Sequence, residues 1–197
     1  LIREMKYFEE DEFLADIDLA EKTVKGDSKP ELHPELFDKE MRVSKTNDPH
    51  RVIAYLTNEN NIGQIKKALI MGIRDYFSKM GFSKAILGSS GGIDSAVTLA
   101  LACEALGREN VFAVLMPSPY STTHSVDDAV QLSRNLGNPY EIIPIKDIYE
   151  SFLNALKPRF RDLPFSVAEE NIQSRTRGNL LMAIANKFGY ILLNTSN

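Results

Sequence analysis

A glycine- and serine-rich segment near the middle of the chain carries the residues best suited to chemistry. Residues 88–95 read Gly-Ser-Ser-Gly-Gly-Ile-Asp-Ser and lie between a short apolar run and a long apolar helical pattern. A strand, a Gly/Ser loop and a helix in this order direct backbone N–H groups and the positive end of the helix dipole toward an anion. The adjacent Gly91 and Gly92 let the backbone approach a ligand closely. The segment therefore predicts a phosphate-binding loop.

Three polar side chains in this loop narrow the chemistry. The hydroxyl groups of Ser90 and Ser95 can donate to phosphate oxygens. The carboxylate of Asp94 would repel a phosphate unless a cation lay between them, so Asp94 predicts a Mg²⁺ ion. The segment is not a Walker A loop, because no Gly-Lys-Ser/Thr follows, and its glycine spacing differs from the dinucleotide-binding fingerprint. The alternative is a turn that only closes a βα unit, with Asp94 complementing the helix dipole.

The elements that must position this loop alternate along the chain. Strands are predicted at 84–88, 111–116, 140–145 and 191–193. Helices are predicted at 61–80, 94–106, about 123–136, 147–156 and 167–188. In the first helix the apolar residues recur three to four apart and predict one buried stripe: Ile62, Ile65, Leu69, Ile73, Tyr76 with Phe77, and Met80. The alternation predicts an α/β fold, a doubly wound parallel sheet with helices on both faces.

Polar loops follow three of the predicted strands, at 88–95, 117–123 and 194–197. Ligands of doubly wound sheets bind beyond the carboxyl ends of the strands. We therefore expect these loops to converge on a nucleotide site.

Composition excludes several classes of protein. The chain has 197 residues, is 43% hydrophobic and carries a net charge of −4 without a basic block, so nucleic-acid binding is not expected. No apolar run is long enough to span a bilayer, so no membrane partner is expected. The single cysteine, Cys103, excludes a disulfide framework and favours a reducing, cytoplasmic compartment. Its apolar neighbours predict a small buried residue rather than a reactive thiolate.

The segment Ser-Gly-Gly-Ile-Asp-Ser at 90–95 resembles the pyrophosphate loop of the ATP pyrophosphatases, which have an adenine nucleotide alpha hydrolase-like fold. These enzymes split ATP between the α- and β-phosphates and adenylate a substrate. Residues 84–197 further resemble the synthetase domain of the glutamine-dependent NAD synthetases. That resemblance is carried by the stretches 116–120, 170–178, 186–189 and 193–197.

The resemblance also implies a domain organisation. Residues 1–20 resemble the tail of the glutaminase (nitrilase-like) domain that precedes the synthetase in those enzymes, and the Lys-, Glu- and Pro-rich residues 21–60 are interpreted as a linker. Residues 61–197 are then an incomplete synthetase domain, truncated at its C-terminal end. In the family, further ATP and metal ligands follow the Thr195 loop and the glutaminase triad lies upstream. A chain with half a site, inactive on its own, is one expectation.

The function implied is ATP-dependent amidation of deamido-NAD to NAD through an adenylated intermediate, with ammonia coming from glutamine. A catalytic role is implied for Ser90, Asp94 and Ser95, with Mg²⁺ at Asp94. Deamido-NAD binding is implied for Asn171 and Arg177. ATP or pyrophosphate binding is implied for Gly88, Ser89, Ser90, Gly91, Gly92, Asp94, Ser95, Met116, Arg175 and Thr195. The resemblance also implies a homodimer of synthetase domains.

Several alternatives stay open. Arg175 and Arg177 are two residues apart on a predicted helix and point in different directions, so only one is expected to face a ligand. Asn171 has the alternative role of a capping or helix-face amide. Another ATP pyrophosphatase, such as GMP synthetase, would share the loop but adenylate a different group. A non-catalytic ATP-binding module would need neither the metal position at Asp94 nor the 170–178 stretch.

Overall fold

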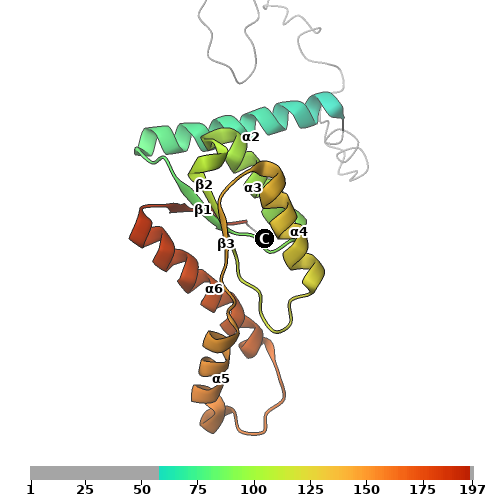
Figure 1. Cartoon of the computed structure of the whole chain (residues 1–197), viewed down its shortest axis with the longest axis vertical. Coiled ribbons are helices and arrows are strands. Elements are labelled where there is room, and N and C mark those ends of the chain that lie inside the picture. Colours follow the sequence, from blue (N-terminus) through green and yellow to red (C-terminus); the bar gives the residue numbers. More distant parts are fainter. Residues whose placement is uncertain (1–57, 196–197) are drawn as a thin grey trace, which may run out of the picture. The chain divides into compact units, whose positions relative to one another are not determined.

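The computed structural model describes residues 58–195, and Lys66–Asn197 form the compact unit that carries the sheet (Figure 1). The predicted glutaminase tail at 1–20 and all but the end of the predicted linker at 21–60 lie outside the described residues. No helix within residues 58–195 is long and apolar enough to cross a membrane.

The sheet has parallel strands in the order β3-β2-β1-β4. Their bounds are β1 Ala85–Gly88, β2 Val111–Leu115, β3 Tyr140–Ile142 and β4 Ile191–Leu192. Ala85 pairs with Val111 of β2 on one side and with Ile191 of β4 on the other. The chain therefore winds away from β1 through β2 and β3 and then returns to its other side. Such a reversal creates a crevice at the carboxyl end of the central strand, so the predicted doubly wound sheet is confirmed.

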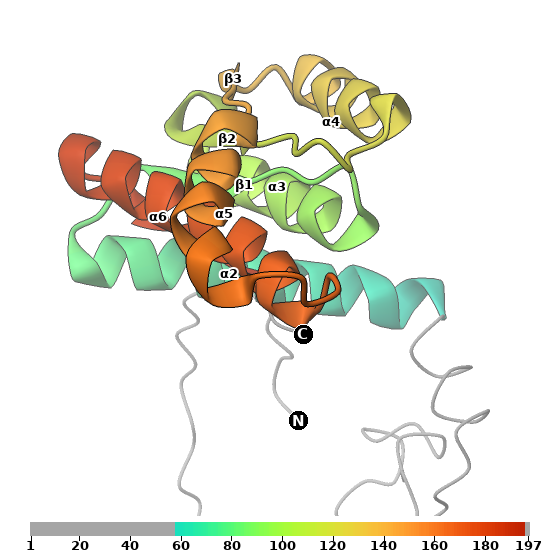
Figure 2. The same ribbon diagram turned by 90° about the horizontal axis from the view of Figure 1, so that it is seen from below.

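Helices cover both faces of this sheet (Figures 1 and 2). Their bounds are α2 Glu59–Met80, α3 Ile93–Leu106, α4 Thr123–Leu136, α5 Lys146–Phe160 and α6 Val167–Phe188, with a short 3₁₀ helix, η2, at Arg108–Asn110. Side chains of α2, α3 and α4 share one core cluster, and those of α6 share a second cluster on the opposite face. α5 packs against α6.

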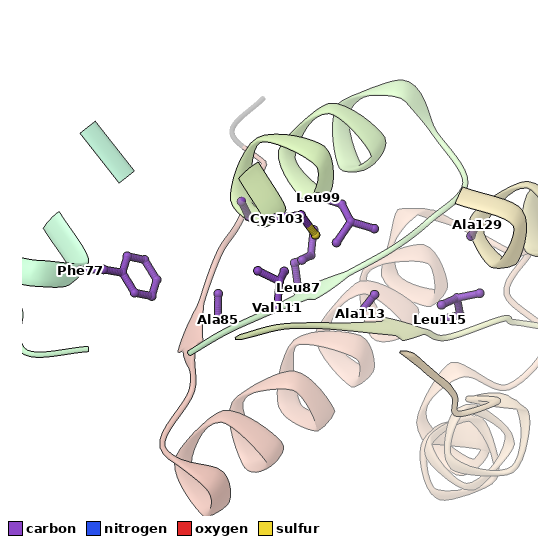
Figure 3. Close-up of a cluster of buried hydrophobic side chains, with 10 residues drawn as sticks. Phe77, Ala85, Leu87, Leu99, Cys103, Val111, Ala113, Leu115 and Ala129 are labelled. Atoms are coloured by element: carbon purple, nitrogen blue, oxygen red, sulfur yellow. The ribbon is translucent and has the colours of Figure 1, made fainter. Parts of the chain in front are cut away.

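The alternation of side chains along β1 assigns its residues to the two clusters. Ala85 and Leu87 belong to the cluster shown in Figure 3, together with Leu99 of α3 and Phe77 of α2. Ile86 belongs to the cluster on the α6 face. Successive residues of a strand point to opposite faces, and a strand buried on both faces is apolar throughout. The run Ala85–Leu87 is apolar for this reason.

The predicted buried stripe of α2 is confirmed only in part. Leu69, Tyr76 and Met80 are about half exposed, and Ile62 and Ile65 are exposed as well. Of the predicted stripe, Phe77 is buried and Ile73 packs against the same core, and Ile70, which the prediction left out, is buried as well. The apolar arc of α2 is wider than its contact with the core, so periodicity alone could not tell which side of the arc is buried.

Two predicted boundaries were also wrong. Helix α5 continues to Phe160 through Pro158, although residues 157–166 were interpreted as a connection. Proline in the last turn removes only one helical hydrogen bond, and Arg161 then ends the helix at a positive φ of 51°. Strand β3 ends at Ile142 rather than Ile145, but the N–H groups of Ile143 and Ile145 still donate to the carbonyls of Leu115 and Pro117.

Helix α6 begins with a reciprocal cap. The Ser166 hydroxyl accepts a hydrogen bond from the N–H of Ala168 at 3.2 Å. The Glu169 carboxylate accepts from the N–H of Ser166 at 2.8 Å and from its hydroxyl at 3.0 Å. This capping box satisfies N–H groups that a helix start otherwise leaves unpaired. It fixes the start of the helix that carries the residues 170–178.

We expect Ser166→Ala to lower the free energy of unfolding by about 1 kcal/mol, because the cap hydroxyl is lost. Ser151→Ala is the control, since the exposed Ser151 hydroxyl only donates to the carbonyl of Asp147 within α5. Urea unfolding measures both. Equal effects of the two substitutions would show that the cap contributes nothing.

The same cap predicts a dependence of stability on pH. The N–H of Ser166 holds the pKa of Glu169 below its ordinary value. A depressed carboxyl pKa stabilises the fold above the ordinary glutamate pKa of about 4.3, and this stabilisation is lost as the pH falls. Glu169→Gln should therefore lose less stability than the parent between about pH 5 and pH 3. Glu170→Gln, at the exposed next residue, is the control. Parallel curves for Glu169→Gln and the parent would contradict the prediction.

Candidate functional site

A cavity of about 640 Å³ lies at the carboxyl ends of β1, β2 and β4. Its wall is completed by the first turn of α4 and by one face of α6. The three predicted loops each contribute, through Ser90, Ser121 and Thr195. The expected convergence of these loops is therefore confirmed, at the crevice that the strand order creates.

Half of the site residues expected from the sequence lie in this wall, and half do not. Those in the wall are Gly88, Ser89, Ser90, Met116, Arg177 and Thr195. Those outside it are Gly91, Gly92, Asp94, Ser95, Asn171 and Arg175. The ligand of each residue stays a prediction.

The loop after β1 is held in shape by its own serines. The buried Ser95 hydroxyl accepts from the N–H of Ser90 at 3.2 Å and donates to the carbonyl of Gly92 at 2.9 Å. The Ser90 hydroxyl accepts from the N–H of Gly92 at 3.2 Å and lies 3.1 Å from the Ser95 hydroxyl. The buried Ser95 side chain therefore holds the loop in shape, whereas Ser90 is exposed at the cavity.

Gly91 brings this loop against α4. Its φ is +80°, a conformation that side chains rarely adopt. A Cβ on Gly91 would overlap the carbonyl oxygen of Ser125, and would lie 2.8 Å from its carbonyl carbon. Position 91 thus requires glycine for two reasons: the backbone has a positive φ, and a Cβ would overlap Ser125.

Ser89 lines the cavity but has a buried hydroxyl group without a partner among residues 58–195. Its backbone N–H donates to the carbonyl of Val114 at 2.9 Å, which extends the pairing of β1 with β2. Its side chain is buried, and within the described residues its hydroxyl has no hydrogen-bond partner. A buried hydroxyl without a partner is unfavourable, so Ser89 carries a local cost at the start of the loop.

Asp94 lies exposed in the first turn of α3, directly after the loop. Residues 58–195 contain no group of three or more histidine, cysteine, aspartate or glutamate side chains that could enclose a metal ion. Mg²⁺, however, is commonly held by one or two carboxylates together with phosphate oxygens and water. A single exposed carboxylate beside a phosphate-binding loop fits that mode.

The two arginines of α6 have different surroundings. Arg177 is half-buried in the cavity wall, and its Nε donates to the carbonyl of Met116 at 3.0 Å. Burial lowers the pKa of Arg177, but a guanidinium stays protonated. Arg175 and Asn171 are exposed and lie one turn apart, outside the wall. The sequence did not tell which of Arg175 and Arg177 faces a ligand. In the structure only Arg177 lines the cavity.

Sequence reasoning missed several residues of the wall. Ser121 lies in a predicted loop without having been singled out, and Ser125, Ser174 and Gly178 lie within helices. Ser125 could have been found from its place in the first turn of the helix after β2. Ser174 and Gly178 belong to the stretch 170–178 that carries the resemblance, but only the packing of α6 decides which of its faces lines the cavity.

Cys103 is not part of the site. It is buried in the core cluster between α3 and the sheet (Figure 3). Burial, and to a smaller extent the Glu109 carboxylate, raises the pKa of Cys103 to about 11. The thiol is therefore protonated at neutral pH and has no access to the cavity, which confirms the prediction of an inert cysteine.

Comparison with known proteins gives a consistent result. The NAD synthase family model matches residues 65–197. The glutamine-dependent NAD(+) synthetase of Synechocystis sp. is 59% identical over 134 residues, which are 68% of this chain and 24% of that protein. The chain spans about a quarter of the length of such curated relatives.

Solved structures of similar proteins share the fold. The glutamine-dependent NAD+ synthetase from Acinetobacter baumannii, in complex with ADP, has a TM-score of 0.67 at 47% identity, over 68% of this chain and 26% of that one. The NH3-dependent NAD synthetase from Campylobacter jejuni has a TM-score of 0.61 at 31% identity, over 68% of this chain and 56% of that one.

Gly91→Ala should lower the free energy of unfolding by about 3 kcal/mol, because it combines an unfavourable φ with overlap at Ser125. The control is Gly72→Ala in the exposed interior of α2, where a Cβ meets nothing within 4 Å. It should raise the free energy of unfolding by about 1 kcal/mol. Thermal unfolding of both variants measures these changes in the free energy of unfolding. A neutral Gly91→Ala would contradict the contact between the loop and α4.

Proposed function

The chain belongs to the NAD synthase family, and from this membership we propose that it carries out the ATP-dependent amidation of deamido-NAD to NAD. The ammonia would come from glutamine, through a glutaminase domain of the kind that residues 1–20 resemble. A cytoplasmic location and a homodimer of synthetase domains belong to the same proposal.

The observation that carries the proposal is the cavity beyond β1. Its volume is in the range of small-molecule sites. It combines the exposed serines Ser90 and Ser121 with the half-buried cation of Arg177. Donors and a cation at a strand-loop-helix junction suit the phosphates of ATP.

The negative charge of ATP exceeds the positive charge that the cavity supplies, so the site requires a further cation. ATP carries about four negative charges, whereas a helix N-terminus supplies about half a positive charge and Arg177 supplies one. Asp94 would hold a Mg²⁺ ion, which would neutralise part of the remaining phosphate charge. The deficit explains why a carboxylate lies next to a loop built for anions.

The proposed reaction has two steps. A carboxylate oxygen of deamido-NAD attacks the α-phosphorus of ATP, the bond to the bridging oxygen breaks, and pyrophosphate leaves. Ammonia then attacks the acyl carbon, and AMP leaves with the attacking oxygen. The substrate supplies its own nucleophile, so the buried thiol of Cys103 needs no part in it. The chain's residues hold the pyrophosphate and align the two reactants.

The positions on α6 favour a revised assignment of its arginines. Arg177 lies in the cavity wall beside Met116, so we assign it to ATP. Asn171 and Arg175 share an exposed stripe of the helix, so we assign them to deamido-NAD, beside the cavity. The resemblance alone implied the opposite roles for the two arginines.

The rival functions differ in substrate or in catalysis. GMP synthetase and its relatives would adenylate another group, and the match over residues 65–197 supports NAD synthase over them. A non-catalytic ATP-binding module would use the same cavity without chemistry. Only activity with defined acids separates these possibilities.

ATP–pyrophosphate exchange in the full-length protein that carries these residues tests the proposal. With Mg²⁺ we expect exchange in the presence of deamido-NAD and none with XMP or aspartate. Asp94→Asn should lower the exchange rate by about 100-fold or more, since several kcal/mol of charge stabilisation is lost.

Asp147→Asn is the matched control, because Asp147 is an exposed aspartate in the first turn of α5. It should leave the exchange rate unchanged. If both substitutions had the same small effect, Asp94 would serve only the helix dipole. Exchange with XMP or aspartate would indicate a sister enzyme, and ATP binding without exchange would indicate a non-catalytic module.

A further inference from the structure

Gly178 occupies an unusual position in the middle of α6. The residues one turn away on either side, Ser174 and Leu181, line the cavity, and Gly178 lines it as well. Residues spaced by three and four share a face of a helix. Any side chain on residue 178 would therefore lie at the cavity wall, between Ser174 and Leu181.

Neither the backbone nor the packing of the protein requires glycine at this position. Gly178 is absent from the glycines with positive φ, and a Cβ built on it would meet no heavy atom within 4 Å. Gly88, at the end of β1, differs, because its Cβ would come within 3.2 Å of Leu181 and Met116. Apart from proline, glycine is the least favourable residue in a helix interior. Gly72 of α2 shares these properties, but only Gly178 leaves its free space at the cavity wall.

The surroundings indicate what this space accommodates. The phosphate-binding loop begins directly after Gly88, whose position is packed between Leu181 and Met116. Beside the loop the wall is apolar, with Leu181, Leu115 and Leu193. An apolar wall next to a phosphate site suits the flat base and the ribose of a nucleotide.

We propose that Gly178 sets the size of this cavity, and that the base and ribose of the nucleotide lie against the bare turn of α6 that it leaves. The inference rests on the proposed function, because it takes ATP as the ligand of the cavity. It assigns to Gly178 a role in specificity: the residue admits a nucleoside phosphate, whereas a larger side chain would leave room for the phosphates alone.

The test is Gly178→Leu in the full-length protein, with ATP and inorganic pyrophosphate as separate ligands in titration calorimetry with Mg²⁺. Leucine favours helices, so the melting temperature should not fall. The affinity for ATP should fall about tenfold or more, because the new side chain overfills the cavity. The affinity for pyrophosphate should stay within about a factor of two.

Gly72→Leu is the matched control, since a Cβ on Gly72 of α2 also meets nothing within 4 Å and that residue lies outside the cavity wall. It should leave both affinities unchanged. Gly178→Ala, which adds only a methyl group, should reduce the ATP affinity less than Gly178→Leu does.

Three results would overturn the inference and leave the proposed function standing. The first is parental ATP affinity in Gly178→Leu with exchange intact. The second is an equal loss of ATP and pyrophosphate binding, which would mean a disturbed phosphate loop. The third is unchanged ATP binding with loss of exchange, which would move the role of Gly178 to the acid substrate.

A parent that bound no ATP would overturn both proposals. A parent that showed the expected loss of ATP binding but no exchange with deamido-NAD would overturn the proposed function alone.

Discussion

The close contact between Gly91 and the Ser125 carbonyl is the constraint on which the site depends. It brings the loop that leaves β1 against the first turn of α4, the helix that leaves β2. Because the two strands are parallel neighbours, both loops start from the same edge of the sheet. The buried Ser95 hydroxyl then holds the loop through hydrogen bonds to Ser90 and Gly92, and Ser90 stays exposed at the cavity. A rigid edge of this kind is what preorganised binding of phosphate requires.

The sequence predicted most of what depends on local patterns. Apolar runs located the four strands, and the Gly/Ser loop with its flanking elements located the edge at which the cavity lies. The order of elements was enough for the doubly wound topology, because parallel strands joined by helices have few permitted arrangements. Cys103 was placed in the core from its apolar neighbours alone.

What the sequence could not predict depends on packing between elements. The apolar arc of α2 is broad, so the buried side, at Ile70 and Phe77, could not be told from the exposed side, at Leu69 and Tyr76. The same limit applied to α6, where the rotation of the helix decides that Arg177 rather than Arg175 lines the cavity. Gly178 became informative only when the space around it was known. Pro158 ended the predicted helix too early, because its effect depends on how close it lies to the helix end.

An isotope experiment distinguishes adenylation of the acid from other uses of ATP in this cavity. Deamido-NAD labelled with ¹⁸O in its nicotinate carboxylate would be converted by the full-length protein with ATP and ammonia. Attack of the carboxylate on the α-phosphorus predicts one ¹⁸O atom in AMP and none in pyrophosphate. Label in inorganic phosphate, with ADP as the second product, would mean attack on the γ-phosphorus and would contradict the account.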